Sequence, residues 1–214
     1  TIESADPFQK IVQDIAKYYN KDAWRSLAEV YSQESTTHRN MRKKLNIPEN
    51  ATVFGGYGGR GSFDISFVHK VIFIIAKNNP NIYFLFANFY KFCDTLPNII
   101  HLDVITDVPV KVTLINTCDA MLWARSEGET FGMAIAEFST CNKPVIAMKI
   151  GHNPGDYAHV KLLGEKAIWY KDQNDLYKIL LTFDPIAESK KDWNAYKEYT
   201  PEKVMKIFKE VYLS

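Results

Sequence analysis

The sequence predicts an α/β fold: a doubly wound parallel sheet covered by helices, with an N-terminal helical extension before it. Two observations carry this prediction. From residue 52 onward, apolar segments of strand length alternate with amphipathic segments of helix length, an order typical of parallel sheets with helices on both faces. In addition, half of the ten glycines lie between residues 55 and 61, directly after the first predicted strand.

The helical extension is expected to cover residues 1–45. Asp6 followed by Pro7 is a typical helix start, and apolar residues then recur every three or four positions up to Tyr19. Two further helices are expected over 22–31 and 36–45. The change of pattern after them predicts a domain boundary at residue 46, with the sheet domain over 46–214.

The sheet domain is expected to contain six strands and seven helices. The predicted strands are 52–55, 82–87, 99–102, 120–124, 144–148 and 167–170. The predicted helices are 65–78, 110–117, 131–140, 157–163, 174–181, 189–198 and 201–212. A Rossmann-like sheet of this kind binds ligands beyond the carboxyl ends of its strands, so the loops after residues 54, 124 and 148 are the expected functional segments.

The composition excludes several classes of protein. The 214 residues are 46% hydrophobic and 24% charged, which excludes a disordered, collagenous or coiled-coil protein. A net charge of +1 does not favour nucleic acid or an anionic membrane as a partner. No apolar run approaches the roughly 20 residues of a transmembrane helix, and no signal peptide is recognised. The three cysteines contain no CxxC pair, so a reducing, cytoplasmic location is expected.

The glycine cluster Gly55-Gly56-Tyr57-Gly58-Gly59-Arg60-Gly61 predicts a phosphate-binding turn. Glycine lets a ligand approach the backbone closely, and free N–H groups at a helix start attract phosphate. Arg60 adds a fixed cation. A tight turn with no ligand is the alternative. The candidate ligand-binding residues of this turn are Gly58, Gly59 and Arg60.

The same cluster also matches the G-x-G-x-x-G fingerprint of dinucleotide-binding folds, at Gly56, Gly58 and Gly61. That fingerprint requires an acidic residue about 20 residues later, at the end of the second strand. Here the second strand ends in Ala87-Asn88, with no acid. An NAD-binding domain is therefore the weaker alternative.

A segment with two glutamates, 125–137, is the most informative part of the chain. Glu129 is expected just before a helix and Glu137 about two turns inside it, so their carboxylates would stand roughly 10 Å apart along the axis. That span suits a nucleoside diphosphate sugar, whose diphosphate could bind the free N–H groups of the helix start without a metal. The simpler interpretation, an acid stabilising the helix dipole, explains Glu129 alone. The candidate donor-binding residues here are Arg125, Glu129, Thr130, Phe131, Gly132, Met133 and Glu137.

This segment resembles the E-x7-E signature of retaining glycosyltransferases with the GT-B fold and is similar to glycosyltransferase family 4. The resemblance runs over roughly residues 39–213 and indicates the C-terminal, donor-binding half of such an enzyme. The matching residues are Ser126, Glu129, Phe131, Gly132, Glu137, Pro144, Val145, Ile146 and Ala147.

The resemblance implies transfer of a hexose from a nucleoside diphosphate sugar to an acceptor hydroxyl. It implies that Glu129, as the catalytic residue, contacts the transferred sugar, that Glu137 binds the ribose, and that the loop near 102–105 faces the base. The family also places an Arg and a Lys on the diphosphate, where this chain has Gly56 and Ser62; Arg60 is the candidate substitute.

The expected partners are the nucleotide-sugar donor, a hydroxyl acceptor, and an acceptor-binding domain elsewhere in the polypeptide. No cofactor is expected, and no metal site, because no histidine pair has ligand spacing on a predicted helix. The segment 152–156 follows a strand, so it could touch the donor or form only a Pro-Gly turn. A non-catalytic nucleotide-sugar-binding module is the alternative function.

Overall fold

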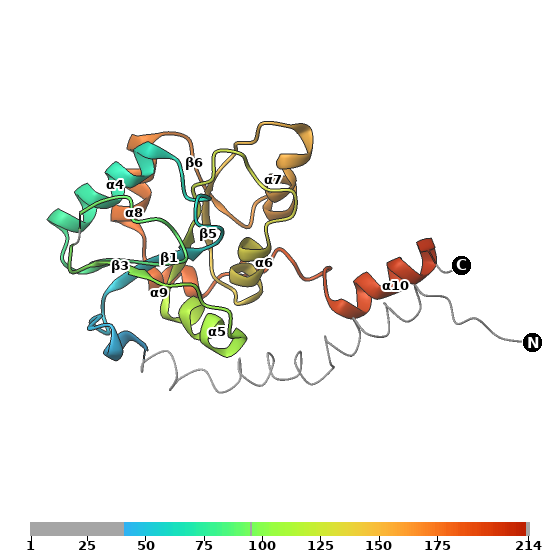
Figure 1. Ribbon diagram of the computed structural model, residues 1–214, viewed down its shortest axis with the longest axis horizontal. Helices are drawn as coiled ribbons and strands as arrows, with labels where there is room; N and C mark the ends of the chain where they lie inside the picture. The colour runs from blue at the N-terminus through green and yellow to red at the C-terminus, as the bar shows by residue number, and fades with distance from the viewer. Residues whose placement is uncertain (1–40, 95, 213–214) are drawn as a thin grey trace, which may run out of the picture.

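The computed structural model describes residues 41–94 and 96–212, shown in Figure 1. The helices predicted within residues 1–40 lie outside the described residues, so the N-terminal extension stays a prediction. The strands are β1 (Thr52–Tyr57), β2 (Ile82–Ala87), β3 (Ile99–Leu102), β4 (Ala120–Leu122), β5 (Val145–Met148) and β6 (Ile168–Tyr170). The helices are α4 (Ser66–Asn78), α5 (Val108–Thr117), α6 (Met133–Thr140), the 3-10 turn η1 (Pro154–Asp156), α7 (Ala158–Leu163), α8 (Gln173–Thr182), α9 (Pro185–Ser189) and α10 (Pro201–Tyr212).

The six strands form one parallel sheet in the order β3-β2-β1-β4-β5-β6. This confirms the predicted α/β, Rossmann-like doubly wound sheet. The strand order reverses between β1 and β4, so the loops that follow these two strands diverge from each other. A crevice at the carboxyl ends of the strands is expected at this switch point.

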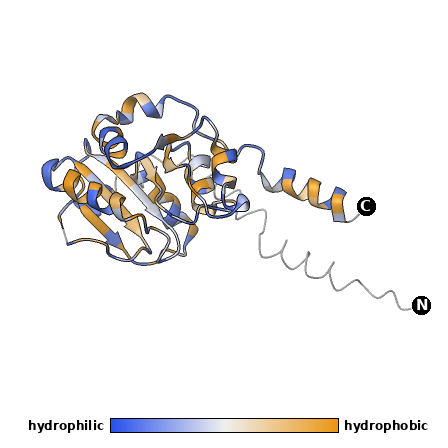
Figure 2. Cartoon of the chain, turned by 90° about the horizontal axis from the view of Figure 1, so that it is seen from above, coloured by the Kyte–Doolittle hydropathy of each residue, from blue (hydrophilic) through white to orange (hydrophobic). Residues whose placement is uncertain are grey.

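Two apolar cores lie on the two faces of the sheet. Phe54 of β1 packs with α4 and α8 on one face, whereas Val53 packs with α5 and α6 on the other, because successive strand residues point to opposite faces. In Figure 2 the apolar colour follows the sheet and parts of the helices around it. Because both faces of the sheet are buried, the strand sequences are continuously apolar and do not alternate between apolar and polar residues.

Two differences from the predicted element boundaries change the expected geometry of the site. Strand β1 continues to Tyr57 because it pairs with β2 up to the register Tyr57↔Ala87, so the phosphate-turn candidates begin at Gly58. Helix α6 begins at Met133 rather than at 131, because Gly132 has a φ of +79°, which lies outside the right-handed helical region. Glu137 therefore lies one turn inside the helix rather than two.

The prediction of a helix over 189–198 is wrong. The observed helix, α9, begins earlier, where the carboxylate of Asp184 accepts the N–H groups of Ile186 and Ala187. After α9 the chain binds the outer side of α6. The N–H of Trp193 donates to Oδ1 of Asn142 at 2.8 Å, and its carbonyl accepts from the Ser139 hydroxyl at 2.9 Å. These tertiary bonds occupy the backbone groups that a helix would have used.

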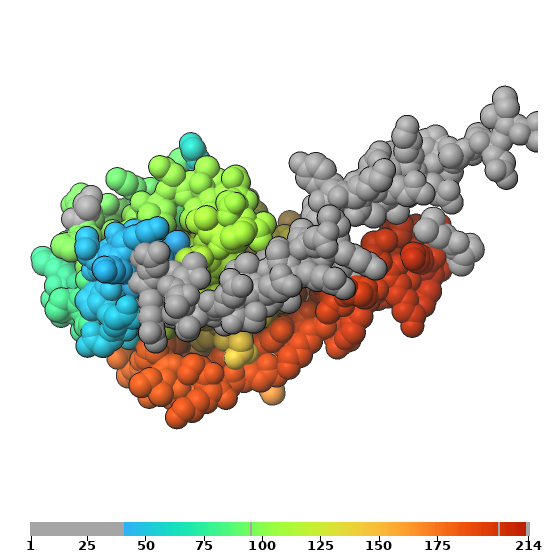
Figure 3. Space-filling view, turned by 90° about the horizontal axis from the view of Figure 1, so that it is seen from below, coloured from blue at the N-terminus to red at the C-terminus, as the bar shows by residue number. Residues whose placement is uncertain are grey.

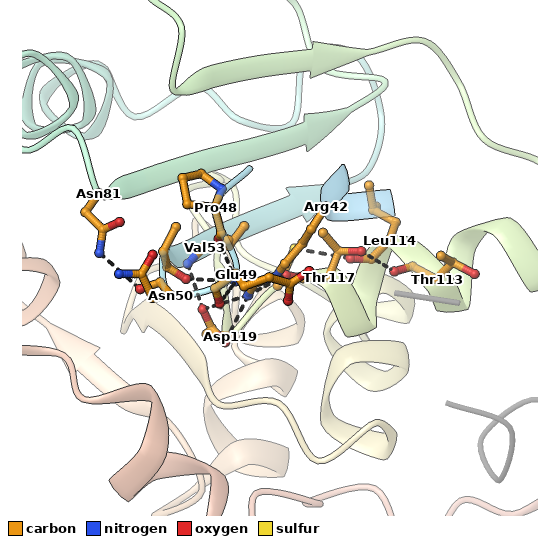
Figure 4. Close-up of polar contacts among 12 residues, drawn as sticks. Arg42, Pro48, Glu49, Asn50, Val53, Asn81, Thr113, Leu114, Thr117 and Asp119 are labelled. Atoms are coloured by element: carbon orange, nitrogen blue, oxygen red, sulfur yellow. Dashed lines mark hydrogen bonds and ion pairs between the residues drawn. The ribbon is translucent and has the colours of Figure 1, made fainter. Parts of the chain in front are cut away.

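Arg42 anchors the first described residues to the amino ends of β1 and β4 (Figure 4). Its guanidinium is buried and donates to the carbonyls of Ala51 at 2.9 Å and Thr117 at 3.1 Å. It also forms an ion pair of 3.2 Å with Asp119, whose carboxylate accepts the N–H of Val53. Arg42 thus joins both central strands at the edge opposite the crevice.

Helix α10 projects from the body of the domain in Figures 1 and 2. Its apolar side chains Val204, Ile207 and Val211 are exposed. In the space-filling view of Figure 3, α10 lies at one end of the molecule, as a continuation of the C-terminal segment. The apolar stripe of α10 is therefore open in the part of the chain that the structure describes.

Candidate functional site

A cavity of about 270 Å³ lies at the carboxyl ends of β1 and β4, at the switch point of the sheet. Three segments form it: the glycine turn after β1, the loop after β4 and the start of α6. Of the predicted site residues, eight line it: Gly58, Gly59, Arg125, Glu129, Thr130, Phe131, Gly132 and Met133.

Two hydrogen bonds from side chains to backbone carbonyls fix the conformation of the glycine turn. The Ser62 hydroxyl donates to the carbonyl of Gly59 at 2.8 Å, and the Asn88 side chain donates to that of Gly58 at 2.6 Å. A Cβ at Gly58 would lie 2.8 Å from the Ser62 oxygen and 3.1 Å from the Phe89 ring. Glycine is needed here because the neighbouring side chains leave no space for another.

Arg60 lies in the same turn but does not line the cavity. Its side chain is exposed, and its carbonyl accepts the N–H of Tyr90 at 3.0 Å. The cation that does line the cavity is Arg125. The structure therefore places Arg125, rather than Arg60, at the wall of this cavity.

Glu129 is held from two sides. The Trp123 indole N–H donates to Oε1 at 3.2 Å, and Arg125 donates to Oε2 at 3.4 Å. Its backbone pairs with the segment after β5: its N–H donates to the Asp156 carbonyl at 2.7 Å, and its carbonyl accepts from Ala158 at 3.1 Å. The Glu129 side chain is 20% exposed, so it is fixed at the cavity wall yet accessible.

Two ion pairs stabilise the charge of Arg125. It forms an ion pair of 2.7 Å with Glu127 as well as the longer one with Glu129. The hydrogen bond to Glu127, together with the charges of Glu129 and Asp64, raises the pKa of Arg125 above its ordinary value. Arg125 is therefore a permanent cation at the cavity.

The start of α6 closes the cavity on its third side. The first N–H groups of a helix have no partner within the helix, and they lie at its positive end. The carbonyl of Phe131 accepts the hydroxyl of Tyr196 at 2.8 Å, which fixes the turn before the helix. Together with Arg125, these amides make this wall suitable for a phosphate group.

Glu137 does not line the cavity, but Tyr57 does. The Tyr57 hydroxyl donates to Oε2 of Glu137, and Lys111 of α5 forms an ion pair of 3.2 Å with Oε1. The Lys111 ammonium also lies 5.5 Å from the centre of the Tyr57 ring. Glu137 is thus adjacent to the cavity through Tyr57, and both of its oxygens have protein partners.

Three of these residues were missed by the sequence analysis. Tyr57 stands inside the glycine cluster, so an aromatic residue among glycines was a usable signal. Trp123 lies within the apolar run 120–124 that includes β4, where it is indistinguishable from a core residue. Lys111 gave no signal, because only the packing of α5 against α6 brings it to Glu137.

A second cavity, of about 310 Å³, adjoins the first and shares Arg125, Glu129 and Thr130 with it. The loop after β5 supplies its other wall, with His152, Asn153 and Asp156. The segment 152–156 therefore lies beside the candidate site and also forms the Pro-Gly turn η1. Its polar lining suits a ligand rich in hydroxyl groups.

Residues 41–94 and 96–212 contain neither a membrane-spanning helix nor a cluster of metal ligands. No helix there is both long and apolar enough to cross a membrane. No group of three or more His, Cys, Asp or Glu side chains in the same residues is arranged to hold a metal ion.

No protein-family model matches the sequence, and no curated protein matches it. Solved structures do match its fold. HepE of Anabaena, in complex with UDP and glucose, superposes with a TM-score of 0.66 at 17% identity, covering 84% of this chain and 52% of that chain. WaaG, a glycosyltransferase involved in lipopolysaccharide biosynthesis, gives 0.61 at 14% identity, covering 86% and 53%. A UDP-forming trehalose-phosphate synthase from Burkholderia xenovorans gives 0.63 at 9% identity, covering 88% and 49%.

The fold is therefore that of a Rossmann-like domain as found in GT-B glycosyltransferases. This chain spans about half the length of these structural neighbours. At these identities the likeness establishes the fold alone.

Proposed function

We propose that this chain is the donor-binding domain of a retaining GT-B glycosyltransferase of the E-x7-E type, similar to glycosyltransferase family 4. It would transfer a hexose from a nucleoside diphosphate sugar to an acceptor hydroxyl. The observation that carries the proposal is the shared cavity, in which the glycine turn, Glu129 and the start of α6 meet at the switch point. HepE, which has the same fold, was solved with UDP and with UDP-glucose.

In this proposal the diphosphate lies against the glycine turn and the first amides of α6. When the bond between the anomeric carbon and the phosphate oxygen breaks, its electron pair goes to the departing diphosphate. The positive helix end and Arg125 stabilise that charge, since donors aimed at developing charge lower the barrier. No metal ion or cofactor is assigned a role. Retention of configuration rests on the sequence resemblance.

Glu129 is assigned to the hydroxyls of the transferred sugar and Glu137 to the ribose. Glu129 keeps acceptor capacity, because a carboxylate offers about four lone-pair positions and Trp123 and Arg125 use two. Glu137 binds Tyr57 and Lys111 in the same way. Both acids are therefore fixed before the ligand arrives, which reduces the entropy lost on binding.

An acceptor-binding domain elsewhere in the polypeptide completes the proposal. This chain covers 52% of the HepE structure and 53% of WaaG. We also propose that residues 1–45 form the helical extension and residues 46–214 the donor domain. The proposed location of the protein is cytoplasmic.

Titration calorimetry with UDP, GDP and their sugars tests the assignment. Glu137→Ala should weaken binding of the nucleotide and its sugar alike, whereas Glu129→Ala should mainly weaken binding of the nucleotide sugar. A lost charged hydrogen bond corresponds to roughly 10-fold or more in affinity. Glu165→Ala, an exposed residue outside both cavities, is the control. Equal binding by the parent and both cavity variants would contradict the assignment.

A second candidate is a nucleotide-sugar-binding module without catalysis of its own. It is favoured by Gly56, which stands where the family carries a diphosphate-binding Arg and lies inside β1, with the Leu122 carbonyl 3.1 Å from any added Cβ. A donor-transfer assay with the neighbouring domains present separates the two functions. Donor binding without turnover would favour the module.

An NAD-binding domain is the least supported function. At the end of β2, where an acid would bind the ribose, Asn88 has a φ of +61° and donates its side-chain amide to Gly58. The Asn88 side chain is therefore already used to fix the glycine turn. Titration with NADH should therefore give no binding.

A further inference from the structure

Two side chains outside both cavities join the loops that form the first cavity. Asp64 lies between the glycine turn and α4, and Ser126 lies in the loop after β4. The Asp64 carboxylate accepts the Ser126 N–H at 2.7 Å and the Ser126 hydroxyl at 2.6 Å. The Asp64 N–H donates to the Ala124 carbonyl at 2.9 Å. The Ile65 N–H donates to the same carbonyl at 3.4 Å, so four hydrogen bonds connect the post-β1 and post-β4 loops.

The residues next to this pair line the cavity. Ser62 and Phe63 directly precede Asp64, and Ala124 and Arg125 directly precede Ser126; all four are lining residues. Both loops lack regular secondary structure at these positions, so no ladder of backbone bonds fixes their separation. The side-chain bonds of the pair, together with the backbone bonds to the Ala124 carbonyl, therefore set the distance between two walls of the cavity, and neither Asp64 nor Ser126 lines it.

The carboxylates near the Asp64–Ser126 pair also determine the pairing of the Arg125 side chain. The negative charges of Glu127, Glu129 and Asp64 all raise the pKa of Arg125. The two oxygens of Asp64 are occupied by Ser126. Arg125 is paired with Glu127 and Glu129, both of which line the second cavity.

We propose that Asp64 and Ser126 form a positioning pair that holds Arg125, and through it Glu129, in the geometry that recognises the donor sugar. This inference rests on the proposed function, to which it adds two residues that do not contact the ligand. Because the pair acts through the loop, its removal should loosen residues 125–130 in the free protein and weaken sugar recognition.

Hydrogen–deuterium exchange of the free protein tests the first part without any ligand. In Asp64→Ala and Ser126→Ala, amides of residues 125–130 should exchange faster, with the strands unchanged. Ser126→Thr keeps the hydroxyl and should restore the parental rate. Asp184→Ala is the matched control, because Asp184 is an exposed carboxylate that also accepts two hydrogen bonds and lines neither cavity. Unchanged exchange of residues 125–130 in Asp64→Ala overturns the proposal.

Calorimetry with UDP-glucose and with UDP tests the second part. Asp64→Ala and Ser126→Ala should each lose about 3- to 10-fold in affinity for the nucleotide sugar and less for UDP. The double variant should lose no more than the stronger single variant, since both remove one unit. Parental affinity in both single variants, with a parent that binds, overturns the positioning role. A parent that binds no nucleotide sugar defeats the proposed function instead, and the exchange rates still decide whether the pair holds the loop.

Discussion

The indole N–H of Trp123 donates a hydrogen bond of 3.2 Å to Oε1 of Glu129. Trp123 directly follows β4 and is buried, with its ring 4.6 Å from that of His159. A core residue thereby orients the carboxylate that we assign to the transferred sugar. Positioning of this kind is effective because a buried ring has a single packed conformation.

Replacement of Trp123 by Phe should weaken sugar recognition while the fold is retained. The change removes the donor to Glu129 and keeps an aromatic ring in the core. We expect affinity for the nucleotide sugar to fall by about 3- to 10-fold, less than the full worth of a hydrogen bond to a charged group, because Arg125 still holds Glu129, with the affinity for UDP little changed. Calorimetry measures both, and circular dichroism checks the fold. An equal loss of affinity for UDP and for the nucleotide sugar would contradict an effect through Glu129.

Replacement of Arg42 by Met should strongly destabilise the domain. It leaves Asp119 and the carbonyls of Ala51 and Thr117 without their buried donor. Removal of one partner from a buried ion pair costs about 3–5 kcal/mol, and urea unfolding measures this loss. Lys203→Met, which breaks an exposed ion pair with Glu198, should change stability by less than about 0.5 kcal/mol. Similar losses in the two variants would contradict this view of Arg42.

Replacement of Gly128 by Ala should destabilise the junction between the loops after β4 and β5. Gly128 has a φ of +79°, and an added Cβ would collide with the carbonyl of Asp156 and lie 2.8 Å from that of Ile150. Strain and collision together predict a loss of about 2–3 kcal/mol in urea unfolding. Gly155→Ala is the control from the same region, because nothing lies within 4 Å of its added Cβ. It should leave stability unchanged.

The free energy of unfolding should decrease as the pH falls below about 6.5. Burial lowers the pKa of His69 and of His101 below the ordinary value of 6.5, and Lys91 lowers that of His101 further. Between the lowered folded pKa and 6.5, the unfolded chain binds more protons, so acidification favours it. The decrease should begin near pH 6.5 and level off below the folded pKa values. Urea unfolding across pH 7.5 to 5 measures it.

His101→Phe should reduce this pH dependence. The Nε2 of His101 is buried with no hydrogen-bond partner among the described residues, and its ring already packs 5.0 Å from Phe92, so a phenyl ring fits the site. The exposed His152→Gln is the control and should follow the parent. An identical pH profile for the parent and His101→Phe would show that His101 does not contribute.

The sequence by itself determined the sheet and most of the candidate site. Strand and helix periods are local, so β2 and β3 were predicted with their observed bounds. Parallel strands place their carboxyl ends at one edge, which is why Gly58 and Glu129, far apart in sequence, were expected together. The E-x7-E spacing made Glu129 and Glu137 candidate acids because it lies within one continuous segment.

Only the tertiary structure decided which side chains surround those acids. Lys111 reaches Glu137 from a different helix, and Asp64 reaches Ser126 across 62 residues. It also turned residues 190–200 away from the predicted helix, because Asn142 and Ser139 bind Trp193 there. Such contacts depend on how separate elements pack, and no local period in the sequence records that packing.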